Sequence, residues 1–307
     1  MPSMRARVLL RLFRSRSKGV KTDWTTLAAI HRFREQAEKG AARFGSVPKG
    51  ITCTSVDVDG RPGEWIRPAA APADRVILYA HGGGYISGSI TDHRGVVAKL
   101  ARRSGVATLL FEYRLAPEHP FPAAVEDSVR AYRWLLNQGF KPEQILLAGD
   151  SAGGGLALVL LLALRQQSIP LPAGAVAISP WTDLLSRGES YVTNAAVCLS
   201  PEGTWTAFGD HYAAGQDKGQ PLISPLYGDL QGLPPLFITT GGAEVLRDDA
   251  IHFADKARQA GVAVTLIVGA GLFHCYPVLA PYFPEATRAM NGICDFIRNQ
   301  LKISPAS

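Results

Sequence analysis

A serine between glycines, placed between two apolar runs, constrains the fold of this chain more than any other feature. The pentapeptide GDSAG is centred on Ser151, follows the apolar run 145–148 and precedes a second apolar stretch at 156–164. This order predicts a strand, a sharp turn and a helix. The hydroxyl would then stand at a helix N-terminus, where free N–H groups and the helix dipole favour negative charge. Ser151 is therefore the candidate nucleophile.

A second glycine-rich turn follows an earlier strand-like run. The run 75–80 leads directly into His81 and three glycines, so HGGG stands at the end of a predicted strand. Glycine has no Cβ, so its backbone N–H can approach a bound group closely. The two turns together predict an oxyanion hole made by two N–H groups of the HGGG turn and the N–H group of Ala152.

Chain order selects the candidate base, because in a fold with this turn the acid and then the histidine follow the serine. Of seven histidines, only His211, His252 and His274 follow Ser151. His252 falls in a helical pattern and His211 in an aromatic region, whereas His274 follows the strand-like run 263–268 by a short loop. Open α/β sheets place their chemistry at the carboxyl ends of strands, which favours His274.

The candidate acid follows the strand-like run 235–240. Glu244 lies at the end of that strand, while Asp248 and Asp249 open the next helical pattern. Capping and the helix dipole already explain carboxylates in a first helical turn. Glu244 is therefore preferred to Asp248 as the acid.

Strand-like runs alternate with helical patterns along most of the chain. The predicted strands are 51–58, 64–67, 75–80, 107–113, 145–149, 174–179, 236–240 and 262–268. Such alternation predicts an α/β fold with a mostly parallel sheet and helices on both faces, after an antiparallel start. The alternation fails between 183 and 225, where aromatic residues and glycines gather.

Four motifs in this order carry a resemblance to a known family. They are HGGGY from His81, YRLAPEHPFPAA from Tyr113, GDSAGGG from Gly149 and SPW from Ser179. The chain resembles the bacterial hormone-sensitive-lipase family of α/β-hydrolases, which are serine carboxylesterases, from about residue 51 to its end. The resemblance implies an α/β-hydrolase fold with an eight-stranded, mostly parallel sheet. It also assigns Ser151 as nucleophile, His274 as base, and Gly82, Gly83 and Ala152 as oxyanion donors.

The resemblance further implies a cap above a catalytic domain. We expect residues 1–50 to form an N-terminal cap segment and 51–307 the catalytic domain, with a cap insert near 183–225. Short- to medium-chain acyl esters would fit beneath such a cap. Tyr85, Trp181 and Tyr212 are the candidate pocket residues, and a place in the core is the alternative for the first two.

Two segments depart from the pattern of that family. Its acid is usually Asp in a D-x-L-x-D setting, whereas residues 244–248 read EVLRD. Its members often carry an acidic, Trp-containing segment before the histidine, whereas residues 268–273 read VGAGLF. The first departure puts Glu244 where Asp is expected, and the second leaves the pocket wall beside His274 undefined.

The cysteines argue against a metal site and a disulfide framework. The four of them, Cys53, Cys198, Cys275 and Cys294, are scattered without C-x-x-C spacing. Cys275 adjoins His274, but the serine constellation already accounts for that histidine, so the thiol is interpreted as a spectator. We expect no cofactor, no metal and no nucleic-acid partner, and a small ester or lactone as substrate.

The net charge of +6 is concentrated at the N-terminus. Residues 1–21 hold no acidic residue and seven basic ones, namely Arg5, Arg7, Arg11, Arg14, Arg16, Lys18 and Lys21. The rest of the chain therefore carries a net charge of −1. Apolar residues between them predict an amphipathic helix, which would serve as part of the cap or contact an anionic membrane surface. The apolar run 8–13 is interrupted and too short for a secretory signal, so a cytoplasmic location is expected.

Three other functions are compatible with the same fold. A lactone hydrolase or an amidase would share the acyl-transfer machinery with an esterase. A non-catalytic small-molecule receptor is the third alternative, and the retained His274 argues against it. The sequence leaves open whether the protein is a monomer or a homodimer.

Overall fold

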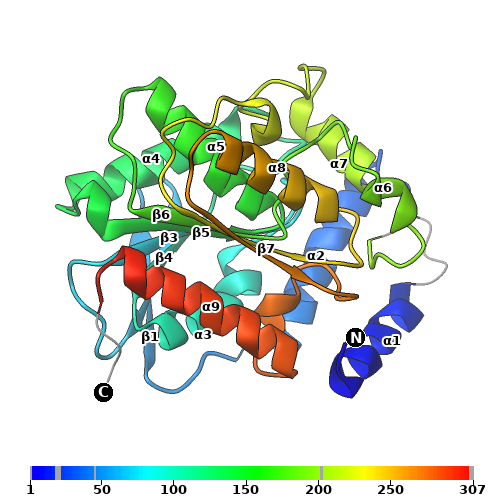
Figure 1. Ribbon diagram of the computed structural model, residues 1–307, viewed down its shortest axis with the longest axis horizontal. Helices are drawn as coiled ribbons and strands as arrows, with labels where there is room; N and C mark the ends of the chain where they lie inside the picture. Colours follow the sequence, from blue (N-terminus) through cyan, green and yellow to red (C-terminus); the bar gives the residue numbers. More distant parts are fainter. Residues whose placement is uncertain (1, 18–21, 45, 201–202, 304–307) are drawn as a thin grey trace.

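The computed structural model describes residues 2–17, 22–44, 46–200 and 203–303 (Figure 1). Lys18 and Lys21 of the basic N-terminal stretch lie outside these residues. The strands are β1 Ile51–Asp57, β2 Pro62–Pro68, β3 Val76–Ala80, β4 Ala107–Phe111, β5 Ile145–Asp150, β6 Gly174–Ile178, β7 Leu236–Gly241 and β8 Val264–Gly269. The α-helices are α1 Met4–Ser17, α2 Leu27–Phe44, α3 Ile90–Ser104, α4 Ala123–Asn137, α5 Ala152–Gln166, α6 Ser190–Thr193, α7 Thr204–Ala213, α8 Arg247–Gln259 and α9 Pro284–Gln300. The short 3-10 helices are η1 Pro142–Gln144, η2 Pro225–Tyr227 and η3 Tyr276–Leu279.

All eight strands form one sheet in the order β1-β2-β4-β3-β5-β6-β7-β8. β2 pairs antiparallel with both β1 and β4, and every pairing from β4 to β8 is parallel. The predicted α/β fold, with an antiparallel start and a mostly parallel sheet, is confirmed. Parallel strands bring their carboxyl ends to one edge, which is where the candidate residues follow β3, β5, β7 and β8.

Helices cover both faces of the sheet, and the central strands are apolar for that reason. In β3, Val76 and Leu78 face one core cluster while Ile77 and Tyr79 face the other. Figure 1 shows α4, α5 and α8 above the sheet and α3 and α9 below it. Because side chains alternate along a strand, burial on both faces requires an unbroken apolar run.

Two segments far apart in the sequence meet near the carboxyl edge of the sheet. α2 lies beside α7, which belongs to the region where the strand and helix alternation fails (Figure 1). The rings of Trp24 and Phe208 are 4.9 Å apart at their centroids, and those of Phe33 and Phe208 are 5.8 Å apart. His211 Nε2 adds a 2.6 Å contact with the carbonyl oxygen of Trp24. Aromatic packing therefore holds the N-terminal segment against the insert.

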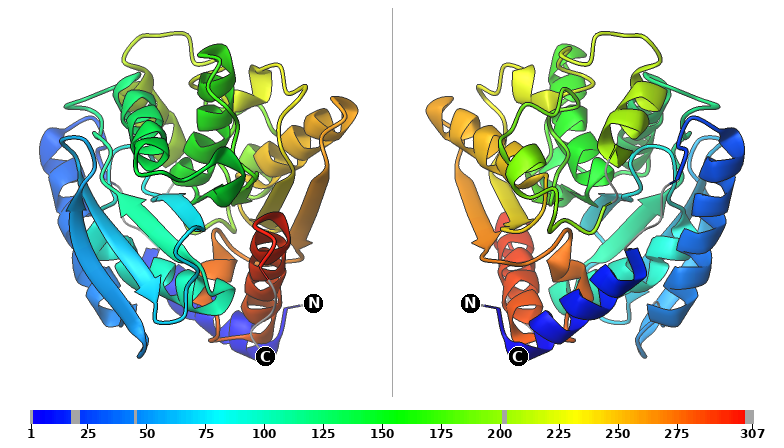
Figure 2. Two further views of the ribbon diagram at one scale, coloured as in Figure 1. Left: turned by 90° about the vertical axis from the view of Figure 1, so that its left-hand side faces the viewer. Right: turned by 90° about the vertical axis from the view of Figure 1, so that its right-hand side faces the viewer.

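α1 packs elsewhere, beside α9 and η3 (Figure 2). Ala6 is buried there, and Leu9, Leu10 and Phe13 pack against the same core cluster as α9. The backbone N–H and the hydroxyl of Ser3 both donate to the carboxylate of Glu285. Among the helices that the structure describes, none is long and apolar enough to cross a membrane.

Candidate active site

The turn that carries Ser151 has the strained geometry expected of a serine between a strand and a helix. Ser151 follows β5 directly, precedes α5, and has φ 56° and ψ −122°. Its N–H donates to the carbonyl of Ile178 at 2.8 Å. A Cβ at Gly153 would lie 2.1 Å from the carbonyl oxygen of Ala80, so only glycine lets α5 begin this close to β3. The turn therefore places the hydroxyl beside the end of β3.

Ser151, His274 and Glu244 lie in hydrogen-bond contact. His274 Nε2 is 2.9 Å from Ser151 Oγ, and His274 Nδ1 contacts Glu244 Oε2. The three residues come after β5, β8 and β7, whose carboxyl ends share one edge of the sheet. Asp248 does not join them, since its carboxylate accepts from the N–H of Ser190 and from Arg247.

Glu244 is fully buried and its carboxylate has several donors. Besides the contact with His274, Oε1 accepts from Ser179 Oγ at 2.8 Å, from the N–H of Gly241 at 2.6 Å and from Thr240 Oγ1. A buried carboxylate is stabilised as an anion only when such donors replace water. Oε1 is thereby held by the end of β7 and by Ser179, and Oε2 is left for the imidazole.

Ser179 links the acid to the loop that carries the histidine. Its hydroxyl donates to Glu244 and accepts from the N–H of Cys275 at 3.0 Å. The sequence analysis noted SPW as a motif without giving Ser179 a role. Its position directly after a buried strand, next to the strand that leads to the acid, was the available signal.

The glycine-rich turn differs from the sequence prediction at Gly82. The N–H of Gly82 donates to His93 Nε2 at 3.1 Å, so it is already engaged. Gly83 and Gly84 line the cavity instead, with φ of 121° and 65°. The carbonyl of Gly83 accepts from the N–H groups of Ile86 and Ser87, which fixes the orientation of the turn.

The candidate oxyanion donors are therefore the N–H groups of Gly83, Gly84 and Ala152, with Gly84 replacing Gly82. As the first residue of α5, Ala152 has an N–H without an acceptor inside its helix. Gly83 and Gly84 have no hydrogen-bond acceptor for their N–H groups among the residues that the structure describes. The sequence pattern HGGG could not distinguish which two of its three glycines face the serine.

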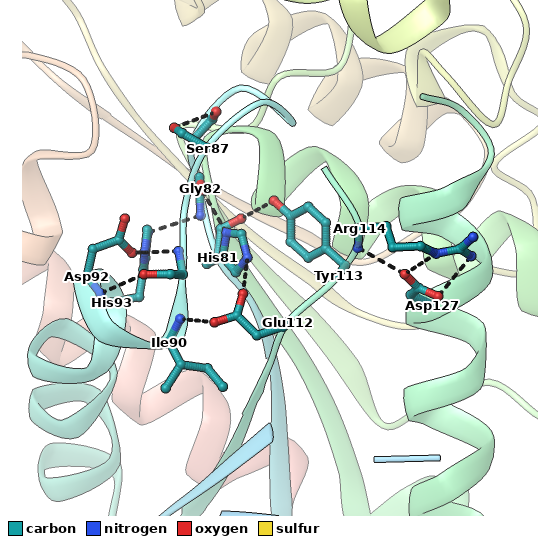
Figure 3. A network of polar contacts seen from close by, with 12 residues as sticks. His81, Gly82, Ser87, Ile90, Asp92, His93, Glu112, Tyr113, Arg114 and Asp127 are labelled. Carbon is teal, nitrogen blue, oxygen red and sulfur yellow. Dashed lines mark hydrogen bonds and ion pairs between the residues drawn. The ribbon is translucent and has the colours of Figure 1, made fainter. Parts of the chain in front are cut away.

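A polar network lies behind this turn (Figure 3). His93 Nδ1 contacts the carboxylate of Asp92, and His93 Nε2 lies 3.5 Å from Asp150 Oδ1. Asp150, next to the nucleophile, also accepts from Tyr79 Oη at 2.8 Å. The network thus joins the glycine-rich turn to the turn at Ser151, and Asp150 organises neighbouring loops, as its position in the sequence suggests.

Two effects on the His93 ring oppose each other. Burial lowers the pKa of His93, whereas the carboxylates of Asp150 and Asp92 raise it. An imidazolium has no lone pair for the N–H of Gly82, however, and 3.5 Å to Asp150 is long for a hydrogen bond. The direct contact with Gly82 favours the neutral ring, with Nδ1–H donated to Asp92.

His81 is a structural residue of the same region. Its ring stacks on Tyr113 with centroids 4.1 Å apart, and its carbonyl accepts from Tyr113 Oη at 2.8 Å (Figure 3). Burial lowers the pKa of His81 to about 4, so this ring is neutral near pH 7. His81 thereby holds the end of β3 and takes no part in the contact between Ser151 and His274.

A cavity of about 420 Å³ opens onto Ser151 and His274. Its aromatic wall comes from both of the segments that meet above the sheet, namely Trp24, Phe33, Trp205 and Phe208. The ring of Trp205 lies edge-on to His274 with centroids 5.5 Å apart. The sequence did not predict these four as cavity residues, because no local pattern indicates which aromatic side chains converge in space.

The three predicted pocket residues lie behind this wall. Tyr85, Trp181 and Tyr212 are at most 1% exposed, belong to the core and do not line the cavity. Tyr85 stacks on Tyr212 with centroids 3.8 Å apart, and Trp181 packs against Trp205 at 5.1 Å. The structure therefore corrects their assignment, because they support the lining residues from the core side.

Cys275 borders the cavity as a protonated thiol. Its Sγ is 3.4 Å from His274 Nε2. Burial raises the pKa of Cys275 well above its ordinary value, and the carboxylates of Asp150 and Glu244 raise it further. The thiolate rather than the thiol is the nucleophilic form, so these surroundings do not activate the sulfur.

Comparisons with known proteins agree with this arrangement. Residues 77–278 match a family model described as alpha/beta hydrolase fold. An acetyl-hydrolase from Streptomyces hygroscopicus is 44% identical over 86% of this chain and 87% of its own length, and an esterase from Acinetobacter venetianus is 38% identical over 77% and 78%. The crystal structure of an esterase from the bacterial hormone-sensitive lipase family superposes with a TM-score of 0.91 at 40% identity, covering 98% of this chain and 99% of that one. The chain therefore belongs to the bacterial hormone-sensitive-lipase family of α/β-hydrolases.

Proposed function

We propose that this protein is a serine carboxylesterase that hydrolyses short- to medium-chain acyl esters through an acyl-enzyme. The observation that carries the proposal is the continuous contact from Ser151 Oγ through His274 to the buried carboxylate of Glu244. Family membership supports ester hydrolysis as the reaction, since relatives of this chain are named esterase and acetyl-hydrolase. The same machinery would serve a lactone hydrolase or an amidase, and no contact in the site favours either.

The first half of the reaction forms the acyl-enzyme. Ser151 Oγ attacks the ester carbonyl while His274 Nε2, at 2.9 Å, accepts the hydroxyl proton. Glu244 holds the proton on Nδ1, which keeps the Nε2 lone pair toward the serine and stabilises the imidazolium that forms. His274 then gives its Nε2 proton to the alcohol oxygen as the bond between carbonyl carbon and alkoxide breaks.

The negative charge of the tetrahedral intermediate needs donors that are already in position. Gly83 and Gly84 line the cavity beside Ser151, and Ala152 follows Ser151 as the first residue of α5. The N–H groups of these three residues would donate to that oxygen. Donors fixed by the fold lose little free energy to reorganisation, which is why such sites act mainly on the transition state.

The second half returns the enzyme to its starting state. A water molecule takes the place of the alcohol and gives a proton to His274 Nε2 as its oxygen attacks the acyl carbon. The second tetrahedral intermediate collapses when His274 returns that proton to Ser151 Oγ. The products are a carboxylic acid and the free serine.

His93 is a positioning residue in this scheme. It lines the same cavity as Ser151 and accepts from the N–H of Gly82, the residue before the first oxyanion donor. Through Asp92 the ring is held at its other nitrogen. His93 thus orients the turn whose next two N–H groups act on the intermediate.

The division into cap and catalytic domain belongs to the same proposal. Of the predicted cap segment 1–50, the part that carries Trp24 and Phe33 would cap the catalytic domain 51–307 together with the insert near 183–225, which supplies Trp205 and Phe208 to the cavity wall. α1 packs beside α9 and does not contribute to that wall. The aromatic wall limits the length of the acyl chain, since a longer chain adds binding only until the cavity is full. A cytoplasmic location is part of the same proposal.

Substitution of the nucleophile tests the mechanism. Ser151→Ala removes the only hydroxyl in contact with His274 among the described residues, so ester turnover and labelling by a fluorophosphonate probe should both be lost. A residual rate of roughly 10³-fold over water can persist from the oxyanion donors and binding. Intact-mass spectrometry after labelling checks this, and a wild-type enzyme that turns over esters yet takes no label contradicts the mechanism.

A matched pair of carboxylates tests the acid. Glu244→Gln should lower kcat by roughly 10²- to 10⁴-fold, because the amide cannot hold the imidazole in the required tautomer. Asp248→Asn, four residues away and bonded to Ser190 and Arg247, should cost much less. Steady-state kinetics on folded variants measure both effects. A larger loss of kcat in Asp248→Asn than in Glu244→Gln would assign the role of the acid to Asp248.

A panel of p-nitrophenyl esters of graded length tests the cap and the substrate class. One related esterase structure was obtained after soaking with p-nitrophenyl butyrate, which makes this series a natural choice. Activity should peak at short or medium chains. Phe33→Ala enlarges the cavity and should move the optimum to longer chains, with about fourfold in kcat/KM for each further CH₂ that is buried.

Phe296→Ala is the control for that panel, because Phe296 packs on Phe237 outside the cavity and should leave the optimum unchanged. If Phe33→Ala left the preferred acyl-chain length unchanged, the proposal that the N-terminal segment forms part of the cap would be wrong. Lactones and anilides in the same panel distinguish the alternative activities, and hydrolysis of either class in preference to every ester would overturn the assignment.

Kinetics of His93 variants test its positioning role. His93→Ala should lower kcat by about tenfold with little change in KM, because loosened oxyanion donors weaken transition-state binding more than ground-state binding. His93→Gln, whose amide oxygen can accept from Gly82, should recover part of the loss. His119→Ala, an exposed histidine, is the control. Equal loss in both His93 variants, or a change confined to KM, would contradict the role.

A further inference from the structure

We propose that the outward face of α1 docks on an anionic lipid surface. Met4, Val8 and Leu12 are 79%, 51% and 52% exposed, which is unusual for apolar side chains. They recur every four residues in one helix, so they form a single stripe along its outer side. Figure 2 shows α1 on the outside of the molecule, beside α9.

Arginines stand on both sides of this stripe. Arg5, Arg7 and Arg11 are exposed. At 100° per residue, Arg7 and Arg11 fall on one flank of the stripe and Arg5 on the other. An apolar stripe between basic flanks is the arrangement by which a helix lies in the plane of a membrane surface, with its cations among the headgroups.

The inner face of the same helix already holds it to the protein. Ala6 is buried and Phe13 lies 5.7 Å from Phe273 between ring centroids. Arg14 donates to the carbonyl of Val197 at 3.0 Å. The folded body therefore uses one side of α1 and leaves Met4, Val8 and Leu12 on the other side at least half exposed.

The charge of the N-terminal segment indicates which kind of surface binds this face of α1. Residues 1–21 carry seven positive charges and no negative one, whereas the remainder of the chain carries only −1. A second copy of this chain therefore presents little net negative charge to α1. A surface of anionic phospholipid supplies dense negative charge and an apolar layer together, which matches both parts of the face.

Docking by this face would also place the cavity near the lipid. Phe13 contacts the residue before His274, and Val197 lies two residues before Leu199, which lines the cavity. A lipophilic ester would then enter from the membrane surface rather than from bulk water. This consequence rests on the proposed function, whereas the docking itself does not.

Co-sedimentation of the full chain with vesicles tests the docking. We expect binding to vesicles of phosphatidylcholine and phosphatidylglycerol, and none to vesicles of phosphatidylcholine alone. Binding should weaken as salt rises, because ions screen the attraction between arginines and headgroups. Absence of binding, or equal binding to both compositions, would overturn the proposal.

Two sets of variants assign the binding to α1. Arg5→Gln, Arg7→Gln and Arg11→Gln combined should weaken partition about a hundredfold, since each cation near an anionic surface is worth about fivefold. Met4→Ser with Val8→Ser should weaken it with the charge unchanged. The matched control combines Lys49→Gln, Arg102→Gln and Lys141→Gln, three exposed cations outside α1, and should retain binding.

Two further measurements separate the alternatives. If the control lost as much binding as the α1 variants, net charge alone would act and the proposal would fail. Light scattering would reveal a dimer that Met4→Ser with Val8→Ser dissociates, and such a dimer without vesicle binding would assign the stripe to a second copy. Ser151→Ala should bind vesicles like the wild type, so loss of ester turnover and loss of docking are read independently.

Discussion

The approach of α5 to the end of β3 is the constraint on which the site depends. Gly153 lies so close to the carbonyl of Ala80 that no side chain fits between them. This contact places Ser151 and the turn that begins at His81 side by side, although 70 residues separate them in the sequence. A larger residue at 153 would move the nucleophile away from the N–H groups of Gly83 and Gly84, and the electrostatic part of the mechanism depends on that proximity.

The buried carboxylate of Glu244 shows how the surroundings accommodate Glu at the position where the family resemblance led us to expect Asp. The longer side chain lies after the end of β7, and its Oε1 is held by Ser179, Thr240 and the N–H of Gly241. These donors stabilise the anion and fix its direction, so that Oε2 meets His274. The substitution is therefore supported by a complete set of contacts.

Two parts of the N-terminal region have different positions and roles. Residues near Trp24 and Phe33 close the cavity by packing on Phe208. α1 lies apart from this cluster, against Phe273, and turns an apolar and basic face outward. From the sequence we predicted one N-terminal segment that would either form part of the cap or contact a membrane surface. In the structure, one part of this segment lines the cavity and another part, α1, faces outward.

The sequence by itself determined the fold, the order of strands and helices, and the residues Ser151, Glu244 and His274 as candidates, because these depend on local periodicity and on chain order. It also indicated that HGGG faces the serine. Only the tertiary structure decided that Gly84 rather than Gly82 borders the cavity, since His93 arrives from another element to engage the N–H of Gly82. The placement of Tyr85, Trp181 and Tyr212 in the core was likewise decided by packing. An aromatic residue becomes a wall or a support according to its neighbours in space, which periodicity along one segment does not contain.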